Sequence, residues 1–391
     1  MTAPRVAIDV TAALQQGGGI GRYTRCLVQA LAPTAHSFAL TLFWTAPRHA
    51  AVPDWLWLLP NVRLRRIPVP DRYATILWQR ARLPLAVEVF IGPQEICHFP
   101  DFVMPPVWRA RTVLTIHDLS FRIVPEAADA GLRRYLNTAV PRSVCRADLV
   151  LADSQTTRRD VTALLGVPPA KTAVLYSGVG AEFRPVHDPA ILATVRRRYG
   201  LPGRFVMTLG TLQPRKNYGR LIQAYADLLR DGGLDWDLVI VGRPGWLYAN
   251  LAADVARLGL AGRVHFLTDA VDAHLPALYS LADVFILVSL YEGFGLPPLE
   301  AMACGTPVIV ANVSSLPEVV GDAGVQVDPK HVPAIATALR DLMVDAPRRA
   351  DLGERGRRQA APFTWERAAA QLAQHYHDLL PLGPRHRRRV G

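Results

Sequence analysis

Short runs of apolar and β-branched residues alternate with helix-like segments along most of the chain. Arg5–Val10 is followed by helical spacing over Arg22–Leu31, and Phe205–Leu209 by helical spacing over Arg220–Leu229. Strands that alternate with helices form parallel sheets covered by helices on both faces. The other expected strands are Leu40–Trp44, Val62–Ile67, Glu95–Phe99, Thr112–Ile116, Leu149–Ala152, Thr172–Tyr176, Asp237–Val241, Val264–Leu267, Val284–Val288, Val308–Val310 and Gly324–Val327. The sequence predicts an α/β protein with doubly wound, mainly parallel sheets.

The alternation is interrupted once, within Phe183–Ile191, where two prolines break the periodicity. A chain of 391 residues favours two domains over one or three. We therefore expect a first Rossmann-like domain over residues 1–185 and a second over residues 186–364. Residues 365–391 would form a terminal amphipathic helix, Trp365–Leu380, and a basic tail with four arginines.

Basic residues exceed acidic ones by 44 − 33 = 11. A basic protein attracts nucleic acid, anionic membranes or phosphorylated substrates. No aromatic–basic pattern typical of RNA binding appears, so a nucleic acid is a poor explanation of the charge. Residues 1–150 contain 17 Arg against 10 Asp and Glu, which favours an anionic membrane surface. With no signal peptide and no long apolar run, we expect a cytoplasmic protein, or one peripheral at the inner face of the membrane.

The loop and helix over Ser289–Gly305 follow one apolar run and precede another, and they contain Glu292 and Glu300. Ligands of parallel sheets bind beyond the carboxyl ends of the strands, where this loop lies. An ionised carboxylate only accepts hydrogen bonds, so it suits a polyol with adjacent hydroxyls. Gly293 and Gly295 allow close approach to a ligand, and the N–H groups of Phe294, Gly295 and Leu296 can donate to it. The alternative is that Glu300, expected in the first helical turn, only caps the helix while Glu292 is solvated.

Two further loops offer groups that suit a phosphate. The glycines of 17–21, with Gly19 among them, bring backbone N–H groups to a helix N-terminus. Arg215 and Lys216 lie where a strand leads into a helix, and both side chains bind phosphate well. A tight turn that needs positive φ, or a solvated helix end, explains the same residues without a ligand.

His117 ends a buried strand, a place where a lone histidine is more often structural than catalytic. The chain has no serine or cysteine nucleophile motif and no cluster with metal-ligand spacing. Its one Asp-x-Asp sequence, at 235–237, enters a strand and so lies at the wrong end of the sheet. We expect no metal.

Together these residues resemble the retaining glycosyltransferases of family 4, which have the GT-B fold. The resemblance covers nearly the whole chain and is most specific in E-G-F-G-L-P-P-L-E-A-M-A-C-G, which is similar to the family's E-x7-E signature. It implies two Rossmann-like domains that face each other across a cleft, with the terminal helix crossing back to the first domain. One departure is Thr211, where many members have arginine, and it shifts phosphate binding onto Arg215 and Lys216.

By this resemblance each candidate residue receives a role. Glu292 would contact the transferred sugar and Glu300 the nucleotide ribose, while His117 would lie beside the donor sugar. Arg215 and Lys216 would hold the diphosphate together with backbone N–H groups. The other donor-binding candidates are Gly19, Gly242, Arg243, Gly293, Phe294, Gly295 and Leu296.

The implied reaction is metal-independent transfer of a sugar from a nucleoside-diphosphate sugar to a hydroxyl, with retention. The donor would be GDP-mannose, a co-substrate and not a cofactor, since the G-T-L-x-P-R-K-N subgroup is similar to many mannosyltransferases. The acceptor would be a glycan or a lipid-linked molecule of cell-surface polysaccharide or glycolipid synthesis. Two alternatives stay open: a nucleotide-sugar epimerase or phosphorylase of the same fold, and a non-catalytic nucleotide-sugar-binding partner in an assembly.

Overall fold

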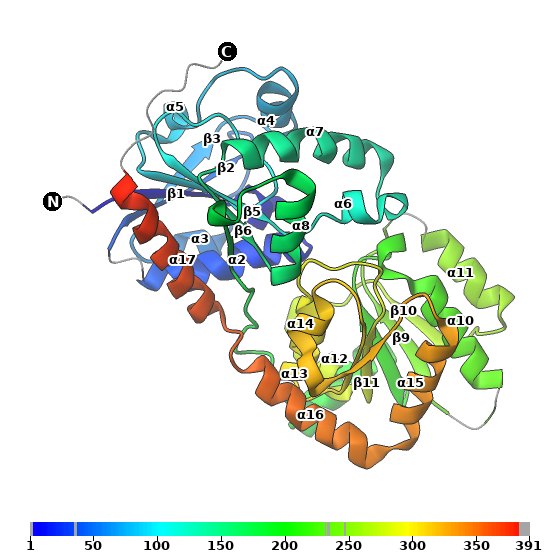
Figure 1. The fold of residues 1–391 in the computed structure, drawn as a ribbon. Helices are drawn as coiled ribbons and strands as arrows, with labels where there is room; N and C mark the ends of the chain where they lie inside the picture. Colours follow the sequence, from blue (N-terminus) through cyan, green and yellow to red (C-terminus); the bar gives the residue numbers. More distant parts are fainter. Residues whose placement is uncertain (1–2, 35–36, 231, 233–234, 246–247, 383–391) are drawn as a thin grey trace. The chain divides into compact units, whose positions relative to one another are not determined.

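A computed structural model describes residues 3–34, 37–230, 232, 235–245 and 248–382 (Figure 1). The expected basic tail, with Arg385, Arg387, Arg388 and Arg389, lies outside the described residues. The chain divides into two compact units. The first contains the residues up to Leu119, the segment Ala130–Gly178 and the segment from Trp365 onward, and the second contains Ser120–Asp129 and Val179–Thr364.

The first unit is built on a seven-stranded sheet in the order β3-β2-β1-β4-β5-β6-β7, with every adjacent pair parallel. Its strands are β1 (Arg5–Asp9), β2 (Ala39–Thr45), β3 (Val62–Ile67), β4 (Ile96–Phe99), β5 (Arg111–Ile116), β6 (Leu149–Ala152) and β7 (Thr172–Val174). The chain first runs from β1 outward to β3 and then returns to the other side of β1. The strand order therefore reverses between β1 and β4.

Helices cover this sheet because packing against it removes their apolar faces from water. The helices of the unit are α1 (Thr11–Gln15), α2 (Gly19–Leu31), α3 (Asp54–Trp57), α4 (Asp71–Thr75), α5 (Glu88–Ile91), α7 (Ala130–Arg146), α8 (Gln155–Leu165) and α17 (Trp365–Leu379). The C-terminal α17 lies beside α2 in Figure 1, and the ring of Trp365 meets the edge of Tyr23 at 5.8 Å. The hydroxyl of Tyr376 on α17 lies 2.7 Å from Nδ1 of the buried His98 on β4.

The second unit is built on a six-stranded sheet in the order β10-β9-β8-β11-β12-β13, again with parallel pairs. Its strands are β8 (Phe205–Leu209), β9 (Asp237–Val241), β10 (Val264–Leu267), β11 (Val284–Leu287), β12 (Val308–Ala311) and β13 (Val325–Val327). All four residues of β11 and of β12 are buried, as expected for central parallel strands. The strand order reverses between β8 and β11.

The helices of the second unit are α6 (Ser120–Ile123), α9 (Pro189–Tyr199), α10 (Tyr218–Arg230), α11 (Tyr248–Arg257), α12 (Leu275–Leu281), α13 (Leu296–Ala303), α14 (Leu316–Val320), α15 (Val332–Val344) and α16 (Ala346–Ala360). One core of this unit joins α10 and α15 to the sheet through residues such as Leu221, Ile240 and Leu339. The predicted doubly wound α/β fold is confirmed in both units.

Several local expectations were wrong. The sequence suggests a helix over Trp78–Val89 that is interrupted near Pro84, whereas the structure has a π-helical turn, Ile76–Arg80, followed by a loop and α5. The strand expected over Thr172–Tyr176 ends at Val174. Among the described residues, none of the helices combines the length and the apolar character that crossing a bilayer takes.

Candidate functional site

The carboxyl ends of β8 and β11 are adjacent because these strands pair directly, with Val206 opposite Val284 and Met207 opposite Phe285. Open parallel sheets bind ligands outside the point where the strand order reverses, and in the second unit that point lies between these two strands. The loop after β8 carries Arg215 and Lys216, and the loop after β11 carries Glu292. The structure thus brings together residues that are 76 and 77 positions apart.

Glu292 lies between the two cations. Nη1 of Arg215 donates to Oε2 of Glu292 at 2.9 Å, and Nζ of Lys216 donates to Oε1 at 2.6 Å. The same Nη1 donates to the carbonyl of Tyr291 at 2.6 Å. Glu292 is 7% exposed and Lys216 is 8% exposed, so this pair is largely removed from water.

The pKa of Glu292 reflects two opposed effects. Burial raises the pKa, because a carboxylate loses hydration, but the charges of Arg215 and Lys216 lower it more. The net pKa is about 2, against the ordinary 4.5. Glu292 is therefore ionised at neutral pH, as a group that accepts hydrogen bonds from sugar hydroxyls has to be.

Backbone contacts fix the two loops to each other. The N–H of Leu290 donates to the carbonyl of Arg215 at 2.8 Å. Asn217 has a left-handed φ of 60°, and its side-chain amide donates to the carbonyls of Val288 and Pro329 at 2.9 and 2.7 Å. The position of Arg215 and Lys216 against Glu292 is therefore set by main-chain anchors.

The N-terminus of α13 is shaped by Gly295, which has a left-handed φ of 119°. A Cβ added there would lie 2.9 Å from Cδ2 of Leu316, so a side chain meets both conformational and steric resistance. Gly293, Phe294 and Gly295 are buried, and Leu296 begins the helix. The hydroxyl of Ser315 donates to the carbonyls of Glu292 and Phe294 at 2.9 and 2.7 Å, and so holds this loop.

Glu300 is the fifth residue of α13, one turn further along than the sequence suggested. It is 2% exposed, and the hydroxyl of Tyr279 on α12 donates to its Oε2 at 2.9 Å. The expectation that Glu300 lies in the first turn was wrong, because α13 begins at Leu296 and includes both prolines.

Gly242 and Arg243 follow β9, next to the loop after β8. The N–H of Leu212 donates to the carbonyl of Arg243 at 3.1 Å, and the Arg243 side chain is exposed. A Cβ on Gly242 would lie 2.0 Å from the carbonyl oxygen of Gly210. Only glycine fits this contact between neighbouring loops.

His117 lies in the first unit, directly after β5, and both of its ring nitrogens have partners. Nδ1 lies 2.7 Å from Oδ2 of Asp153, and Nε2 lies 2.7 Å from the carbonyl oxygen of Pro100. Burial lowers the pKa of His117, but the charge and hydrogen bond of Asp153 raise it more, to about 9. His117 is thus a buried cation whose ring is fixed in place.

The Gly-rich loop of the first unit lies between α1 and α2. Gly19 is the first residue of α2; it is exposed, and a Cβ added there would meet nothing within 4 Å. The alternative explanation of these glycines, a tight turn that needs positive φ, does not hold, since no glycine of 17–21 has a positive φ. The residue that requires glycine is Gly21, where a Cβ would lie 1.9 Å from the carbonyl oxygen of Gln16.

Three aspartates of the first unit went without a role in the sequence reasoning. Asp9 is the last residue of β1, and Asp101 lies just after the adjacent strand β4, where the strand order reverses. Burial raises the pKa of Asp9 to about 6, although Thr11 donates to it through its N–H and hydroxyl. Asp153 directly precedes Ser154, the N-cap of α8, and its carboxylate lies 2.7 Å from Nδ1 of His117. The position of these aspartates at or just after the ends of buried strands is the sequence signal that could have identified them as site residues.

No group of three or more His, Cys, Asp or Glu side chains in the described part of the chain could hold a metal ion. Asp235 and Asp237 lie at the beginning of β9, where both approach Arg263, at 3.5 and 2.7 Å. This is the end of the sheet away from Glu292, as expected.

Comparisons with known proteins agree with this geometry. The family model "Glycosyl transferases group 1" matches residues 196–359, and "Glycosyltransferase Family 4" matches residues 17–183. The O-antigen chain mannosyltransferase B of Escherichia coli is 33% identical over 372 residues, which cover 92% of this chain and 95% of that protein.

Two solved structures share the fold over almost the whole chain. A sucrose-phosphate synthase from Thermosynechococcus elongatus has a TM-score of 0.76 at 22% identity and covers 97% of this chain and 100% of its own. Anabaena HepE, in complex with UDP and glucose, has a TM-score of 0.73 at 20% identity and covers 96% of this chain and 100% of its own. The chain therefore belongs to glycosyltransferase family 4 and is a glycosyltransferase of the GT-B fold, related to mannosyltransferases.

Proposed function

We propose that this glycosyltransferase moves mannose from GDP-mannose to a hydroxyl of a glycan or lipid-linked acceptor, with retention of configuration and without a metal. The acceptor would belong to cell-surface polysaccharide or glycolipid synthesis at the inner face of the membrane. The observation that carries the proposal is the ionised Glu292 between Arg215 and Lys216 at the point where the strand order reverses. The relation to a mannosyltransferase along 92% of the chain supports the choice of sugar.

In this proposal the second unit binds the donor. Arg215, Lys216 and the backbone N–H groups of Phe294–Leu296 at the N-terminus of α13 hold the diphosphate, where the helix dipole also favours an anion. Gly242 and Arg243 lie near the base, and the buried carboxylate of Glu300 accepts from the ribose hydroxyls. Negative charge grows on the leaving diphosphate as the glycosidic bond breaks, and these fixed cations and N–H groups stabilise it. Addition of a chelator is accordingly expected to leave turnover unchanged.

Glu292 orients the transferred sugar by accepting hydrogen bonds from its hydroxyls. We do not propose it as a nucleophile of the kind found in retaining glycosidases, because both of its oxygens bond cations, which lowers their nucleophilicity. Instead, the acceptor hydroxyl attacks from the face that the diphosphate leaves, and a β-phosphate oxygen takes its proton. The leaving diphosphate thus takes up the proton that the acceptor hydroxyl loses, so the reaction needs no further base.

The first unit would complete the site if its carboxyl edge faces that of the second unit across a cleft. His117 would then lie beside the donor sugar, and the N–H of Gly19 beside the diphosphate. Both ring nitrogens of His117 have partners within the protein. We therefore propose that His117 contributes a fixed positive charge, and that other groups hydrogen-bond the 6-hydroxyl of the donor sugar.

A thermal-shift panel with GDP, UDP, dTDP and their sugars tests the donor. GDP and GDP-mannose are expected to raise the melting temperature most. A larger shift with UDP-glucose than with GDP-mannose would overturn the choice of donor and leave the transferase assignment intact. Incubation with the donor alone, followed by a search for an epimer or a sugar phosphate, separates the epimerase and phosphorylase alternatives.

A further inference from the structure

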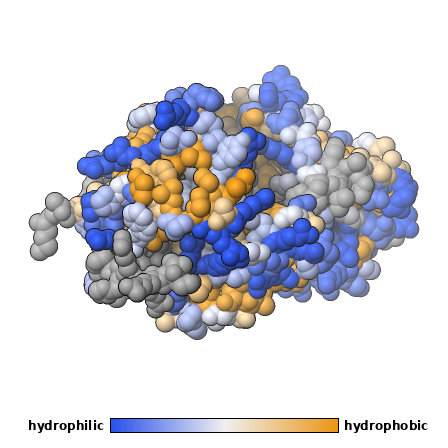
Figure 2. Space-filling view, turned by 90° about the horizontal axis from the view of Figure 1, so that it is seen from above, coloured by the Kyte–Doolittle hydropathy of each residue, from blue (hydrophilic) through white to orange (hydrophobic). Residues whose placement is uncertain are grey.

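Large apolar side chains are exposed together on one part of the first unit. They belong to α4, the π-helical turn Ile76–Arg80, the loop after it, α5 and the segment before β5. We call them the 73–108 patch: Tyr73, Ile76, Leu83, Leu85, Val89 and Trp108, with exposed fractions from 36% to 51%. Figure 2 looks onto the face that carries α4 and α5, and hydrophobic atoms gather there between hydrophilic ones.

Hydrogen bonds tie the segments of the patch into one surface. Nε1 of Trp78 donates to the carbonyl of Leu85 at 2.8 Å, which folds the loop back on the π-helical turn. The carboxylate of Glu88 on α5 accepts from the backbone N–H groups of Trp108 and Arg109 at 2.9 and 3.0 Å. These bonds hold the loop against the π-helical turn, and α5 against the segment before β5.

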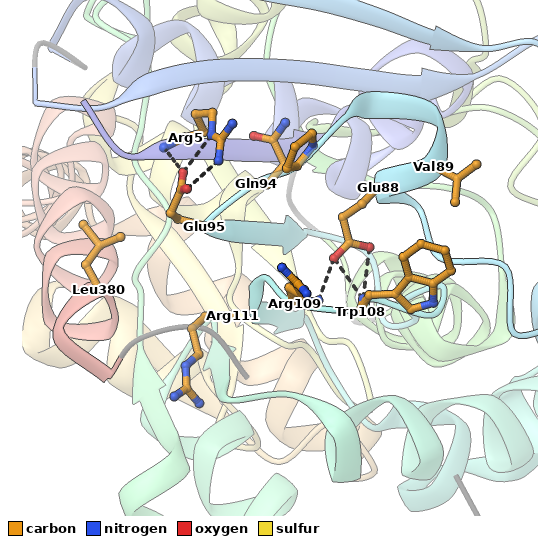
Figure 3. Close-up of a pocket in the computed structure, with 10 residues that line it drawn as sticks. Arg5, Glu88, Val89, Gln94, Glu95, Trp108, Arg109, Arg111 and Leu380 are labelled. Carbon is orange, nitrogen blue, oxygen red and sulfur yellow. Dashed lines mark hydrogen bonds and ion pairs between the residues drawn. The ribbon is translucent and has the colours of Figure 1, made fainter. Parts of the chain in front are cut away.

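The patch opens into a pocket of about 480 Å³ (Figure 3). Val89 and Trp108 of the patch form part of its wall, together with Leu380. Arg5, Arg109 and Arg111 also line it, and Arg5 is already paired with Glu95 at 2.7 Å. Glu88 and Glu95 line the pocket too, so apolar groups are mixed there with charges of both signs.

Arginines are frequent in the sequence that carries the patch. The stretch from Arg63 to Arg82 contains six arginines and a single acidic residue, Asp71, so its net charge is 6 − 1 = +5. The exposed arginines within it are Arg63, Arg65, Arg72, Arg80 and Arg82, and the exposed Arg109 follows Trp108. A partner that covers this surface therefore has to be both anionic and apolar.

An anionic phospholipid bilayer has both properties. Aliphatic and aromatic side chains enter the boundary between headgroups and acyl chains, while arginines bind the phosphates. In the described part of the second unit, the large exposed apolar residues Ile123, Ile191, Val271 and Val344 come from four separate segments.

We propose that the 73–108 patch and its arginines dock this chain onto an anionic phospholipid bilayer. This proposal extends the proposed function, and its biological role rests on the acceptor at the membrane proposed above. Docking itself is a property of the surface and is measured without donor, acceptor or turnover. The patch belongs to the first unit, whereas the proposed donor residues Arg215, Lys216 and Glu292 belong to the second.

Vesicle flotation tests this. The full chain is mixed with vesicles of phosphatidylcholine alone or of phosphatidylcholine with phosphatidylglycerol, at low and high salt. We expect flotation only with the anionic vesicles, and less of it at high salt. The double variant Arg80→Gln/Arg109→Gln is expected to bind at least about tenfold more weakly, because each arginine near an anionic surface contributes substantially to affinity. The double variant Ile76→Ser/Leu83→Ser is expected to show a larger loss of vesicle binding at high salt than at low salt.

Matched controls come from the second unit: Arg197→Gln/Arg198→Gln for charge, and Ile191→Ser/Val271→Ser for exposed apolar area. They are expected to float like the wild type. No flotation at low salt, or equal losses in patch and control variants, would overturn the proposal. So would a dimer in sedimentation analysis that Ile76→Ser/Leu83→Ser abolishes, since the patch would then join two copies. GDP-induced thermal shifts, measured on the same variants, report separately on the proposed function.

Discussion

At the scale of single residues, the site depends on one buried carboxylate and its two cations. Glu292, Arg215 and Lys216 were each singled out from the sequence, as groups suited to hydroxyls and to phosphate. Their mutual contacts were not predicted, because these contacts follow from the pairing of β8 with β11. The periodicity of a single segment does not reveal which strands pair. The same limit hid the bond between His117 and Asp153, which directly follow the paired strands β5 and β6.

The first prediction concerns acid stability. The pKa of Glu292 is 4.5 in an unfolded chain and about 2 in the folded one. A lowered pKa stabilises the fold above about pH 4.5, and this stabilisation, on the order of 3 kcal/mol, is lost as the pH falls from 4.5 towards 2. Urea unfolding at a series of pH values should therefore give a difference between wild type and Glu292→Gln that shrinks across this window. A constant difference would contradict the ion-pair account.

The second prediction concerns the diphosphate. Lys216→Met removes a charge-assisted donor, and such bonds contribute roughly 1.5–3 kcal/mol. GDP affinity is expected to fall about tenfold to a hundredfold, as measured by calorimetry at a temperature where the variant remains folded. Lys330→Met removes an exposed lysine elsewhere in the same unit and should leave GDP affinity unchanged. Equal affinities in wild type and Lys216→Met would remove Lys216 from the diphosphate site.

At the scale of elements, the strands were largely predictable from the sequence. The helices that connect them were less so. Buried parallel strands such as β11 and β12 are short and uniformly apolar, so their runs stand out in sequence. The first turn of α13 was misplaced because the helix was expected to start at Pro298, whereas it begins two residues earlier, at Leu296. The helix expected from Trp78 onward is replaced by a π-helical turn, Ile76–Arg80, for which local propensity gives no signal.

The third prediction concerns the N-terminus of α13. Gly295→Ala places a Cβ at φ 119° and 2.9 Å from Leu316, at a cost of roughly 1–2 kcal/mol. The melting temperature should fall by about 2–4 °C per kcal/mol, and GDP affinity should fall as well, because the N–H groups of the loop shift. Gly219→Ala is the control, since a Cβ at Gly219 in α10 meets nothing within 4 Å. A neutral Gly295→Ala would show that the loop does not need its left-handed turn.

The fourth prediction concerns the contact of α17 with the first sheet. Burial lowers the pKa of His98 to about 3, so this histidine is neutral and shares hydrogen bonds with Tyr376 and Thr115. Tyr376→Phe leaves a buried polar nitrogen without its partner, which costs about 1–3 kcal/mol of unfolding free energy. Tyr199→Phe removes a similar tyrosine–histidine bond at a partly buried site and should cost less. If the two substitutions cost the same, burial is not what gives the α17 contact its strength.

At the scale of the whole molecule, the fold class and the family could both be predicted from the sequence. The alternation of strands and helices indicated two Rossmann-like halves, and the spacing of Glu292 and Glu300 supplied the family. The chain division differs in detail, since Ser120–Asp129 groups with the second unit and the change of unit comes at Val179. Such groupings depend on contacts between distant segments, which residue periodicity does not encode.

The most direct test compares the release of GDP from GDP-mannose by wild type and by Glu292→Gln, with GDP affinity and the melting curve measured on the same preparations. The account predicts that turnover of the variant falls about a hundredfold or more, the scale seen when one preorganised polar group is removed from an active site, while GDP affinity changes little. A folded Glu292→Gln variant that turns over GDP-mannose like the wild type would contradict it.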